Sequence, residues 1–145
     1  MKLSVKFTYN GMMKGGQNRR EIGQVGETIV VEFLKRKGFK ILDRNYRKPW
    51  GEIDIIAEKG GVVRFVEVKS VSREIGDSFS REMDYRPEEL VNASKLKKIA
   101  RTAELYMESK GDEREYQIDV VGVILDKVKR SARCRLIEQA VDDEL

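Results

Sequence analysis

The chain has 145 residues, a length that suits one domain with one hydrophobic core. Charged side chains make up 37% and hydrophobic ones 40%, which describes a globular protein with a densely charged surface. Histidine is absent and Cys134 is the single cysteine, so the composition excludes an intrachain disulfide, a serine–histidine triad and every zinc site that uses imidazole. Any chemistry must therefore rest on lysines and on carboxylates, and the carboxylates can bind a hard cation.

The formal net charge of +4 is concentrated at the N-terminus. Residues 1–20 carry five of the 29 basic groups and no acid, so the remainder holds 24 basic groups against all 25 acidic ones. We predict that residues 1–18 form a flexible basic arm, with at most one short strand near Leu3 to Phe7, and that residues 19–145 form a single domain. The arm is either a solubilising tail or a source of phosphate contacts. With one cysteine and no long apolar run, we expect a cytoplasmic protein that does not enter a membrane.

The first predicted element after the arm is a helix from about Arg20 to Lys37, where apolar residues recur three and four positions apart. A short strand, Phe39 to Arg44, and a basic, aromatic loop, Asn45 to Pro49, should follow. Two segments rich in β-branched residues, Ile53 to Glu58 and Val62 to Ser70, flank two glycines, Gly60 and Gly61. This arrangement predicts a β-hairpin.

The second half begins with a polar stretch, Val71 to Glu89, which we interpret as a long loop containing at most a turn of helix. Asn92 can cap a second helix that ends at Gly111, with a buried stripe comprising Leu96, Ile99, Ala103 and Tyr106. The apolar segment Ile118 to Leu125 predicts a buried strand, and Arg133 to Val141 a last strand at a sheet edge. The order predicts an α/β protein whose mixed β-sheet is flanked by helices (αβββαβ).

The predicted hairpin brings acidic side chains together. If it turns on Gly60-Gly61, Asp54 lies opposite Glu67 and Glu52 opposite Lys69, whereas a turn one residue earlier would place Glu52 opposite Glu67. In either register, alternation sends these four side chains to one face of the sheet. Their neighbours should point to the other face: Ile53, Ile55, Val66 and Val68.

Two adjacent carboxylates repel each other by about 3 kcal/mol at an effective dielectric near 20. A hard cation, Mg²⁺ or Mn²⁺, would remove the conflict between Asp54 and Glu67, and the carbonyl of Val68 could be a further ligand. Such a cation activates water for attack on a phosphodiester, and Lys69 is placed to stabilise the charged transition state. The alternative is an exposed, salt-bridged sheet face in which Glu52 pairs with Lys69.

The runs Gly51-Glu52-Ile53-Asp54-Ile55-Ile56-Ala57 and Phe65-Val66-Glu67-Val68-Lys69 resemble the motif of the PD-(D/E)xK nuclease superfamily. The chain is more closely similar to the YraN-like family of small bacterial proteins, which resemble archaeal Holliday junction resolvases. That similarity extends from about Gly23 to Val123 and includes Gly23-x-x-Gly26-Glu27, Asn45-Tyr46-Arg47 and Asp119. It implies a restriction-endonuclease-like core in a nuclease-like domain.

The resemblance also implies roles for individual residues. Asp54 and Glu67 would be metal ligands, Lys69 the catalytic lysine and Glu27 an additional acid. Strand alternation, independently of the resemblance, adds Glu52 as an auxiliary acid. The implied function is a metal-dependent DNA endonuclease acting on branched or partly single-stranded DNA, as a homodimer by analogy with resolvases. Two departures from the family pattern are Trp50 before Gly51 and Gln117, where an arginine is expected.

Basic and aromatic residues around this motif are candidate contacts to nucleic acid, because they bind phosphates and stack on unpaired bases. They lie in the loop before the hairpin (Arg44, Tyr46, Arg47, Lys48 and Trp50) and in the second helix (Lys95, Lys97, Lys98 and Arg101). A simple solvated helix face is the alternative for these lysines. Two other functions stay open: a non-catalytic nucleic-acid-binding module that retains the nuclease fold, and a protein-interaction adaptor.

Overall fold

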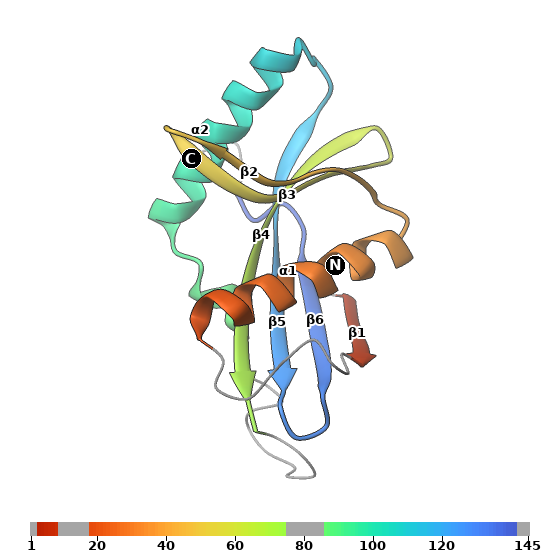
Figure 1. Cartoon of the computed structure of the whole chain (residues 1–145). Coiled ribbons are helices and arrows are strands. Elements are labelled where there is room, and N and C mark those ends of the chain that lie inside the picture. The colour runs from red at the N-terminus through yellow and green to blue at the C-terminus, as the bar shows by residue number, and fades with distance from the viewer. Residues whose placement is uncertain (1–2, 9–17, 75–85, 142–145) are drawn as a thin grey trace.

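The computed structural model describes residues 3–8, 18–74 and 86–141, which build a six-stranded mixed sheet in the order β1-β6-β5-β4-β3-β2 (Figure 1). β4 and β5 are parallel, and every other neighbouring pair is antiparallel. None of the helices in these ranges is long and apolar enough to cross a bilayer. The elements are β1 (Leu3–Thr8), α1 (Arg19–Arg36), β2 (Lys40–Lys48), β3 (Gly51–Lys59), β4 (Val62–Arg73), the 3-10 helix η2 (Pro87–Leu90), α2 (Ala93–Lys110), β5 (Tyr116–Asp126) and β6 (Ser131–Ile137).

The predicted α/β class is confirmed, because α1, β2, β3, β4, α2 and β5 follow one another in the expected αβββαβ order. Both helices lie where the apolar spacing placed them. The side chain of Asn92 accepts a hydrogen bond from Lys95 N at 2.9 Å, which caps α2, and Gly111 ends the helix at φ +60°. Asn18 caps α1 in the same way, accepting from Glu21 N at 3.0 Å.

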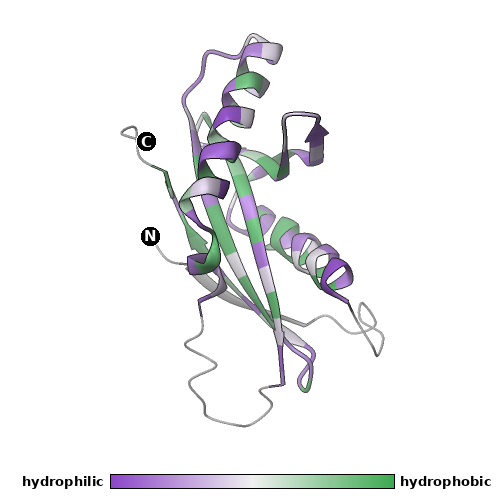
Figure 2. Cartoon of the chain, turned by 90° about the vertical axis from the view of Figure 1, so that its left-hand side faces the viewer, coloured by the Kyte–Doolittle hydropathy of each residue, from purple (hydrophilic) through white to green (hydrophobic). Residues whose placement is uncertain are grey.

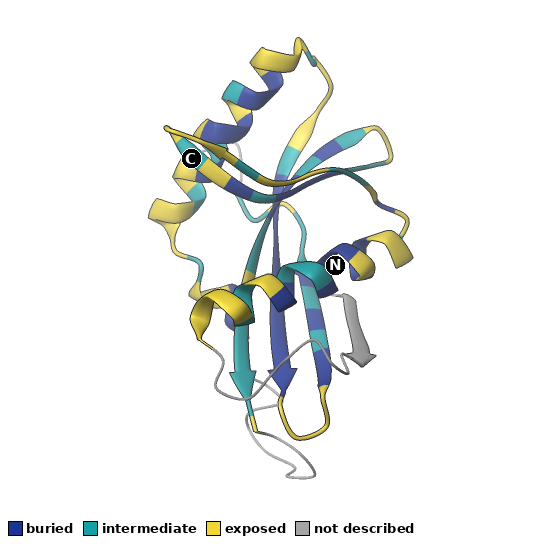
Figure 3. Ribbon diagram, viewed as in Figure 1, coloured by how far each residue is buried: buried dark blue, intermediate teal, exposed yellow. Residues whose placement is uncertain are grey.

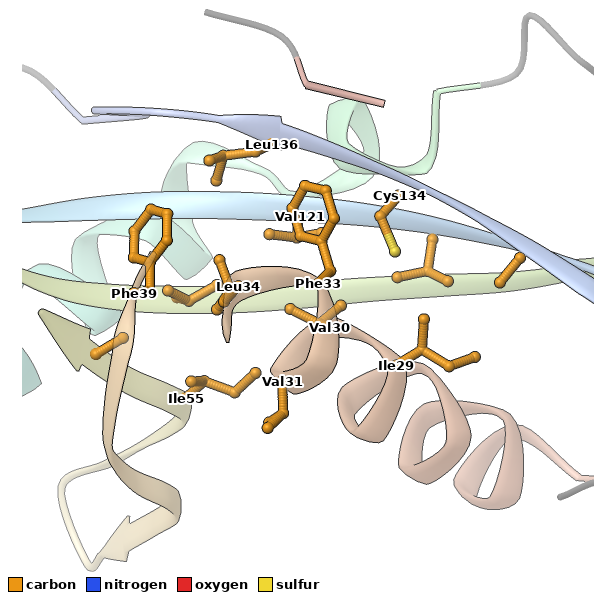
Figure 4. Packing of buried hydrophobic residues seen from close by; sticks show 14 of the residues in the cluster. Ile29, Val30, Val31, Phe33, Leu34, Phe39, Ile55, Val121, Cys134 and Leu136 are labelled. Carbon is orange, nitrogen blue, oxygen red and sulfur yellow. The ribbon is translucent and has the colours of Figure 1, made fainter. Parts of the chain in front are cut away.

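The two helices cover opposite faces of the sheet, as the view in Figure 2 shows. On one face, Phe33 and Leu34 of α1 are fully buried against Val121 and Leu136 of the central strands (Figure 4). Burying such side chains contributes about 1.5–3 kcal/mol each. Figure 3 shows the resulting buried band along β5, with exposed residues at the helix surfaces.

On the other face, Ile99 and Tyr106 of α2 pack against Ile53 and Phe65. The ring of Tyr106 meets that of Phe65 edge to face, with centroids 5.5 Å apart. The sheet therefore lies between two separate apolar clusters, and polar side chains of β3 and β4 can emerge only where neither helix covers the strands.

The basic, aromatic loop predicted over Asn45 to Pro49 is mostly strand. β2 continues to Lys48 and pairs with Gly51, leaving Pro49 and Trp50 as the two-residue turn into β3. The register shifts between Ile41 and Asp43, and Asn45 has a φ of +51°. The error arose because a polar, basic sequence is typical of loops, whereas here it lies on a sheet-edge strand whose hydrogen bonds come from β3.

The predicted loop Val71 to Glu89 starts later than expected, because β4 extends to Arg73 alongside β5. The turn of helix expected within it is η2, and residues 75–85 lie outside the described residues. Parallel pairing with β5 explains the extension, since it supplies partners for the backbone of a polar segment.

The last strand, β6, is not at the sheet edge as predicted, because β1 pairs antiparallel with it from Leu3 to Thr8. The short strand expected near Leu3 to Phe7 is thus present, but it belongs to the sheet and not to an arm separate from the domain. The other residues of the predicted arm, apart from Asn18, lie outside the described ranges.

Candidate metal centre

The hairpin that carries the acidic motif turns on Gly60 and Gly61, which have φ values of +61° and +77°. These left-handed conformations suit glycine and match the twist of a two-residue hairpin. Lys59 pairs with Val62, so the first of the two predicted registers is confirmed and the alternative turn is wrong.

The pairing of β3 with β4 stops at Ile55 and Val66. The direct pairs expected next, Asp54 with Glu67 and Glu52 with Lys69, are therefore not formed. Asp54 Oδ2 instead accepts a hydrogen bond from Val68 N at 2.9 Å. The carboxylate takes the place of a carbonyl in the strand ladder, and β3 and β4 separate around it. We call this point, where Asp54 of β3 meets Glu67 and Val68 of β4, the fork.

The expected alternation of side chains fails at the same point. Ile53 packs in the cluster under α2 together with Ile56, whereas Ile55 packs in the cluster under α1. A regular strand would send Ile53 and Ile55 to the same face. Because β3 is irregular at Asp54, the prediction that four charged side chains share one face is wrong for β3. The two of β4, Glu67 and Lys69, do share the face opposite Val66 and Val68.

The third acid near the fork, Glu27, comes from α1. Gly26 lies directly against Ser70 of β4, where an added Cβ would stand 2.8 Å from the Ser70 Cβ. This close approach presses the helix onto the strand and brings the next residue, Glu27, to Asp54. Burial first, and then the Asp54 charge, raise the pKa of Glu27 to about 7. The positive charges of Arg44 and Arg47 on β2 partly lower the pKa of Glu27 again, so both arginines lie near the site.

Glu67 is the most strongly perturbed acid of the site. Burial, followed by the charge of Asp54, raises its pKa to about 8, and Lys95 counteracts part of the rise. Lys95 Nζ lies 3.8 Å from Glu67 Oε1, so the first turn of α2 is joined to the fork. Hydrogen bonding with Asp54 also raises the pKa of both Glu27 and Glu67, so Asp54 lies between the other two acids.

These carboxyl groups have the chemistry that a hard cation requires: oxygen donors whose mutual repulsion otherwise retains protons. Within the described ranges, however, no three Asp, Glu, His or Cys side chains are arranged as ligands of one ion. The three acids interact electrostatically without converging on one point. The donor chemistry matches Mg²⁺ or Mn²⁺ better than zinc, because these ions prefer oxygen ligands, and Mg²⁺ usually takes only one or two protein carboxylates and completes its shell with water.

The remaining predicted site residues separate into two groups. Lys69 follows Glu67 by two residues and is exposed, and its side chain has no hydrogen bond or ion pair with the part of the chain that the structure describes. Glu52 is exposed and its strand partner is Arg47, so it does not join the three acids. The fork therefore contains Glu27, Asp54 and Glu67, with Lys69 beside it.

The candidate nucleic-acid contacts on β2 and its turn lie next to those on α2. An added Cβ at Gly51 would lie 3.2 Å from the Thr102 Cβ, so the turn between β2 and β3 rests on α2. Trp50 in this turn is 49% exposed. Tyr46, by contrast, is half-buried, and its ring packs edge to face on that of Tyr106, with centroids 5.3 Å apart, against the cluster under α2. On α2, the other basic candidates are exposed: Lys97, Lys98 and Arg101.

Asp119 lies outside the fork and has a structural environment. Its fully buried carboxylate accepts from Gln117 Nε2 at 2.8 Å and from Gln139 N at 2.9 Å, and Arg64 Nη1 is 3.3 Å away. Gln117, one of the departures from the family pattern, thus serves as a donor to Asp119. These contacts join β4, β5 and the segment after β6.

Comparison with known proteins gives one consistent result. The model of the uncharacterised protein family UPF0102 matches residues 26–123. A UPF0102 protein of Dictyoglomus thermophilum is 39% identical over 112 residues, covering 76% of this chain and 87% of the relative. Another, from Moorella thermoacetica, is 37% identical over 123 residues, covering 84% and 96%.

Among solved structures, "The structure of Pyrococcus Furiosus SfsA in complex with Ca2+" is 18% identical and covers 84% of this chain and 63% of that chain. Its TM-score of 0.31 is too low to carry an argument about fold or function.

Proposed function

The chain belongs to the uncharacterised protein family UPF0102, the YraN-like family, and within it we propose that this protein is a metal-dependent DNA endonuclease. The observation that carries the proposal is the fork between β3 and β4. There, Asp54 accepts the Val68 N–H at 2.9 Å, and its charge helps to raise the pKa of Glu27 and Glu67. A cation that displaces the retained protons would stabilise all three acids at once.

Asp54 and Glu67 would hold Mg²⁺ or Mn²⁺, with the Val68 carbonyl as a further oxygen donor. When bound, the ion supplies an activated water and offsets charge on the scissile phosphate. Glu27, whose pKa is raised to about 7, would be the group that takes up a proton at the site. Lys69 is exposed beside the fork and free to contact the phosphate, where its ammonium would stabilise the negative charge of the transition state.

The substrate that the surface favours is DNA with unpaired bases. Lys95 contacts Glu67 at the start of α2, and Thr102, about 10 Å farther along the helix, touches the turn that carries Trp50. Exposed cations on α2 can bind phosphates along this path. The exposed indole can stack on a base, which requires a nucleotide outside the duplex. Branched or partly single-stranded DNA offers such nucleotides beside a duplex.

A second candidate is a non-catalytic nucleic-acid-binding module. It is favoured by the Lys95–Glu67 contact, because the Lys95 ammonium lies where it competes with a cation for the same carboxylate. It is also favoured by the lack of a three-ligand cluster among the described residues. This candidate predicts DNA binding that is unaffected by divalent ions.

Two further parts of the proposal concern assembly and location. Homodimerisation is proposed from the resemblance to junction resolvases, and light scattering in solution would test it. A cytoplasmic location is proposed from the cysteine usage, and cell fractionation would test it.

In the decisive experiment, labelled DNA is incubated with the protein and Mg²⁺, Mn²⁺ or a chelator. The DNA substrates are a duplex, a flap, a Y-shaped duplex with unpaired arms and a four-way junction. We expect metal-dependent cleavage by wild type and a loss of about 100-fold or more in Lys69→Ala and Glu67→Gln. Lys127→Ala and Glu52→Gln are matched controls, because Lys127 is exposed beyond the end of β5 and Glu52 does not join the acids. Equal cleavage by Lys69→Ala and wild type would refute the mechanism.

A further inference from the structure

One buried acid outside the fork has no part in the site described so far. Glu88 lies on η2, its side chain is 0% exposed, and neither carboxylate oxygen accepts a hydrogen bond from the described residues. Among the residues that the structure describes, the cation paired with it is Arg135, whose Nη1 is 4.0 Å from Oε1, too far for a hydrogen bond. A dehydrated carboxylate in this position needs a donor.

The sheet register shows which donor is near. Lys69 of β4, Gly122 of β5 and Arg135 of β6 are direct neighbours in one row across the sheet. Residues paired in this way point to the same face. An added Cβ at Gly122 would collide with the carboxylate of Glu88 and lie 2.8 Å from its backbone nitrogen. Glu88 therefore fills the side-chain position that Gly122 leaves empty, between two cationic neighbours.

The same face carries the metal-binding acid of the proposed function. Glu67 is two residues before Lys69 on β4, and Lys95 lies beside it. Along this face, charges alternate: Lys95, Glu67, Lys69, Glu88 and Arg135. Lys69 lies between two acids, each of which already has one cation at about 4 Å.

We propose that Glu88 is a positioning residue for Lys69, holding its ammonium beside the site when a divalent cation occupies Glu67. The proposal rests on the proposed function, because it is the bound cation that would repel Lys69 from Glu67. The four-carbon stem of a lysine can span the distance between adjacent strands, which is about 4.8 Å. Gly122 is required for this arrangement, since any larger residue would displace the Glu88 carboxylate.

The test compares Glu88→Gln with Glu89→Gln, a neighbouring acid that is exposed and paired with Arg86. The first readout is the rate at which an amine-acylating reagent modifies Lys69, measured by peptide mass spectrometry with and without Mg²⁺, with Lys127 as internal reference. We expect Glu88→Gln to change the Lys69 rate about threefold or more in Mg²⁺, and Glu89→Gln to leave it unchanged. This readout does not require nuclease activity.

The second readout is cleavage of flap DNA. Glu88→Gln should lower kcat about tenfold or more while KM and the Mg²⁺ dependence change less than about twofold, as for a residue that orients another. If Glu88→Gln does not fold, Glu88→Asp retains the charge, shortens the side chain and should show intermediate values. An unchanged Lys69 acylation rate in a folded variant would overturn the proposal and leave Glu88 as a partner of Arg135 alone. If wild type cleaves no DNA but the acylation result holds, the proposed function fails and the Glu88–Lys69 contact stands.

Discussion

Asp54 Oδ2 accepts the backbone N–H of Val68 at 2.9 Å, at the point where β3 and β4 separate. One carboxylate thus has two tasks, since it replaces a lost strand hydrogen bond and supplies charge to the site. These tasks can be separated by mutation, because an amide oxygen can also accept from N–H but has no charge.

Asp54→Asn should fold almost as stably as wild type but bind Mn²⁺ weakly, whereas Asp54→Ala should also lose about 1–2 kcal/mol of unfolding free energy. Urea denaturation measures the stability and calorimetric titration the binding. Equal stability of the two variants would show that the Val68 contact contributes nothing to the fold. Unaltered Mn²⁺ binding by Asp54→Asn would remove Asp54 from the metal site.

Two glycines of α1 provide a matched pair. Gly26→Ala should destabilise the protein by about 1–3 kcal/mol, because the methyl group collides with Ser70. Gly23→Ala should stabilise it by about 0.5–1 kcal/mol, because nothing lies within 4 Å and alanine favours the helix. Thermal denaturation distinguishes them. Adding Ser70→Gly to Gly26→Ala should restore part of the loss, and a Gly26→Ala variant as stable as Gly23→Ala would contradict the close approach.

Proton binding and cation binding should compete. The pKa of Glu67 is raised to about 8 and that of Glu27 to about 7, so the folded, metal-free protein favours their protonated forms. This contribution to stability is fully present below the ordinary carboxyl pKa and is lost as the pH rises through about 7 to 8. A cation replaces the protons, so its affinity should increase over the same range, by up to about tenfold per pH unit for each proton released.

Thermal midpoints recorded without metal between about pH 5 and pH 9 would check the first half of this prediction. Wild type should lose stability towards high pH, and Glu67→Gln should lose less because its amide does not titrate. Identical pH profiles would mean that Glu67 titrates at its ordinary value in the folded protein.

Asp119 should affect stability and not metal binding. Asp119→Ala leaves Arg64 without one of its two acidic partners in a nearly dry environment, and should cost about 3–5 kcal/mol of unfolding free energy. Asp112→Ala is the surface control, because Asp112 pairs with Arg114 in an exposed bridge and should change stability little. Mn²⁺ titration of folded Asp119→Asn should match wild type. Loss of binding there would place Asp119 in the site.

Trp50 should contribute to binding of unpaired bases. Trp50→Ala should weaken binding of single-stranded and flap DNA by about 1–3 kcal/mol, with a smaller effect on blunt duplex. Trp50→Phe keeps an aromatic face and should restore part of the affinity. Fluorescence anisotropy at fixed salt measures all three proteins. An equal loss on duplex and single-stranded DNA would indicate a phosphate contact or a structural role, not stacking.

Most of the secondary structure could be predicted because its signals are local. The apolar spacing in α1, the Asn92 cap and Gly111 stop of α2, and the Gly60-Gly61 turn all act within a few residues. The edge strands were harder to predict. β2 has the polar composition of a loop, and β1 depends on β6, more than a hundred residues away, for its hydrogen bonds.

The sequence by itself determined which acids and which lysine are candidates, and limited the hairpin to two registers, of which the structure shows the one that turns on Gly60-Gly61. Only the tertiary structure decided how they meet, because the strand pairing ends at Ile55 and Asp54 becomes an acceptor for Val68. It also decided that Glu27 joins them, through the contact of Gly26 with Ser70, and that Glu52, exposed opposite Arg47, does not. The register follows from the turn residues within the hairpin. The break in strand pairing depends on residues far apart in the sequence, because α1 and α2 pack on opposite faces of the sheet.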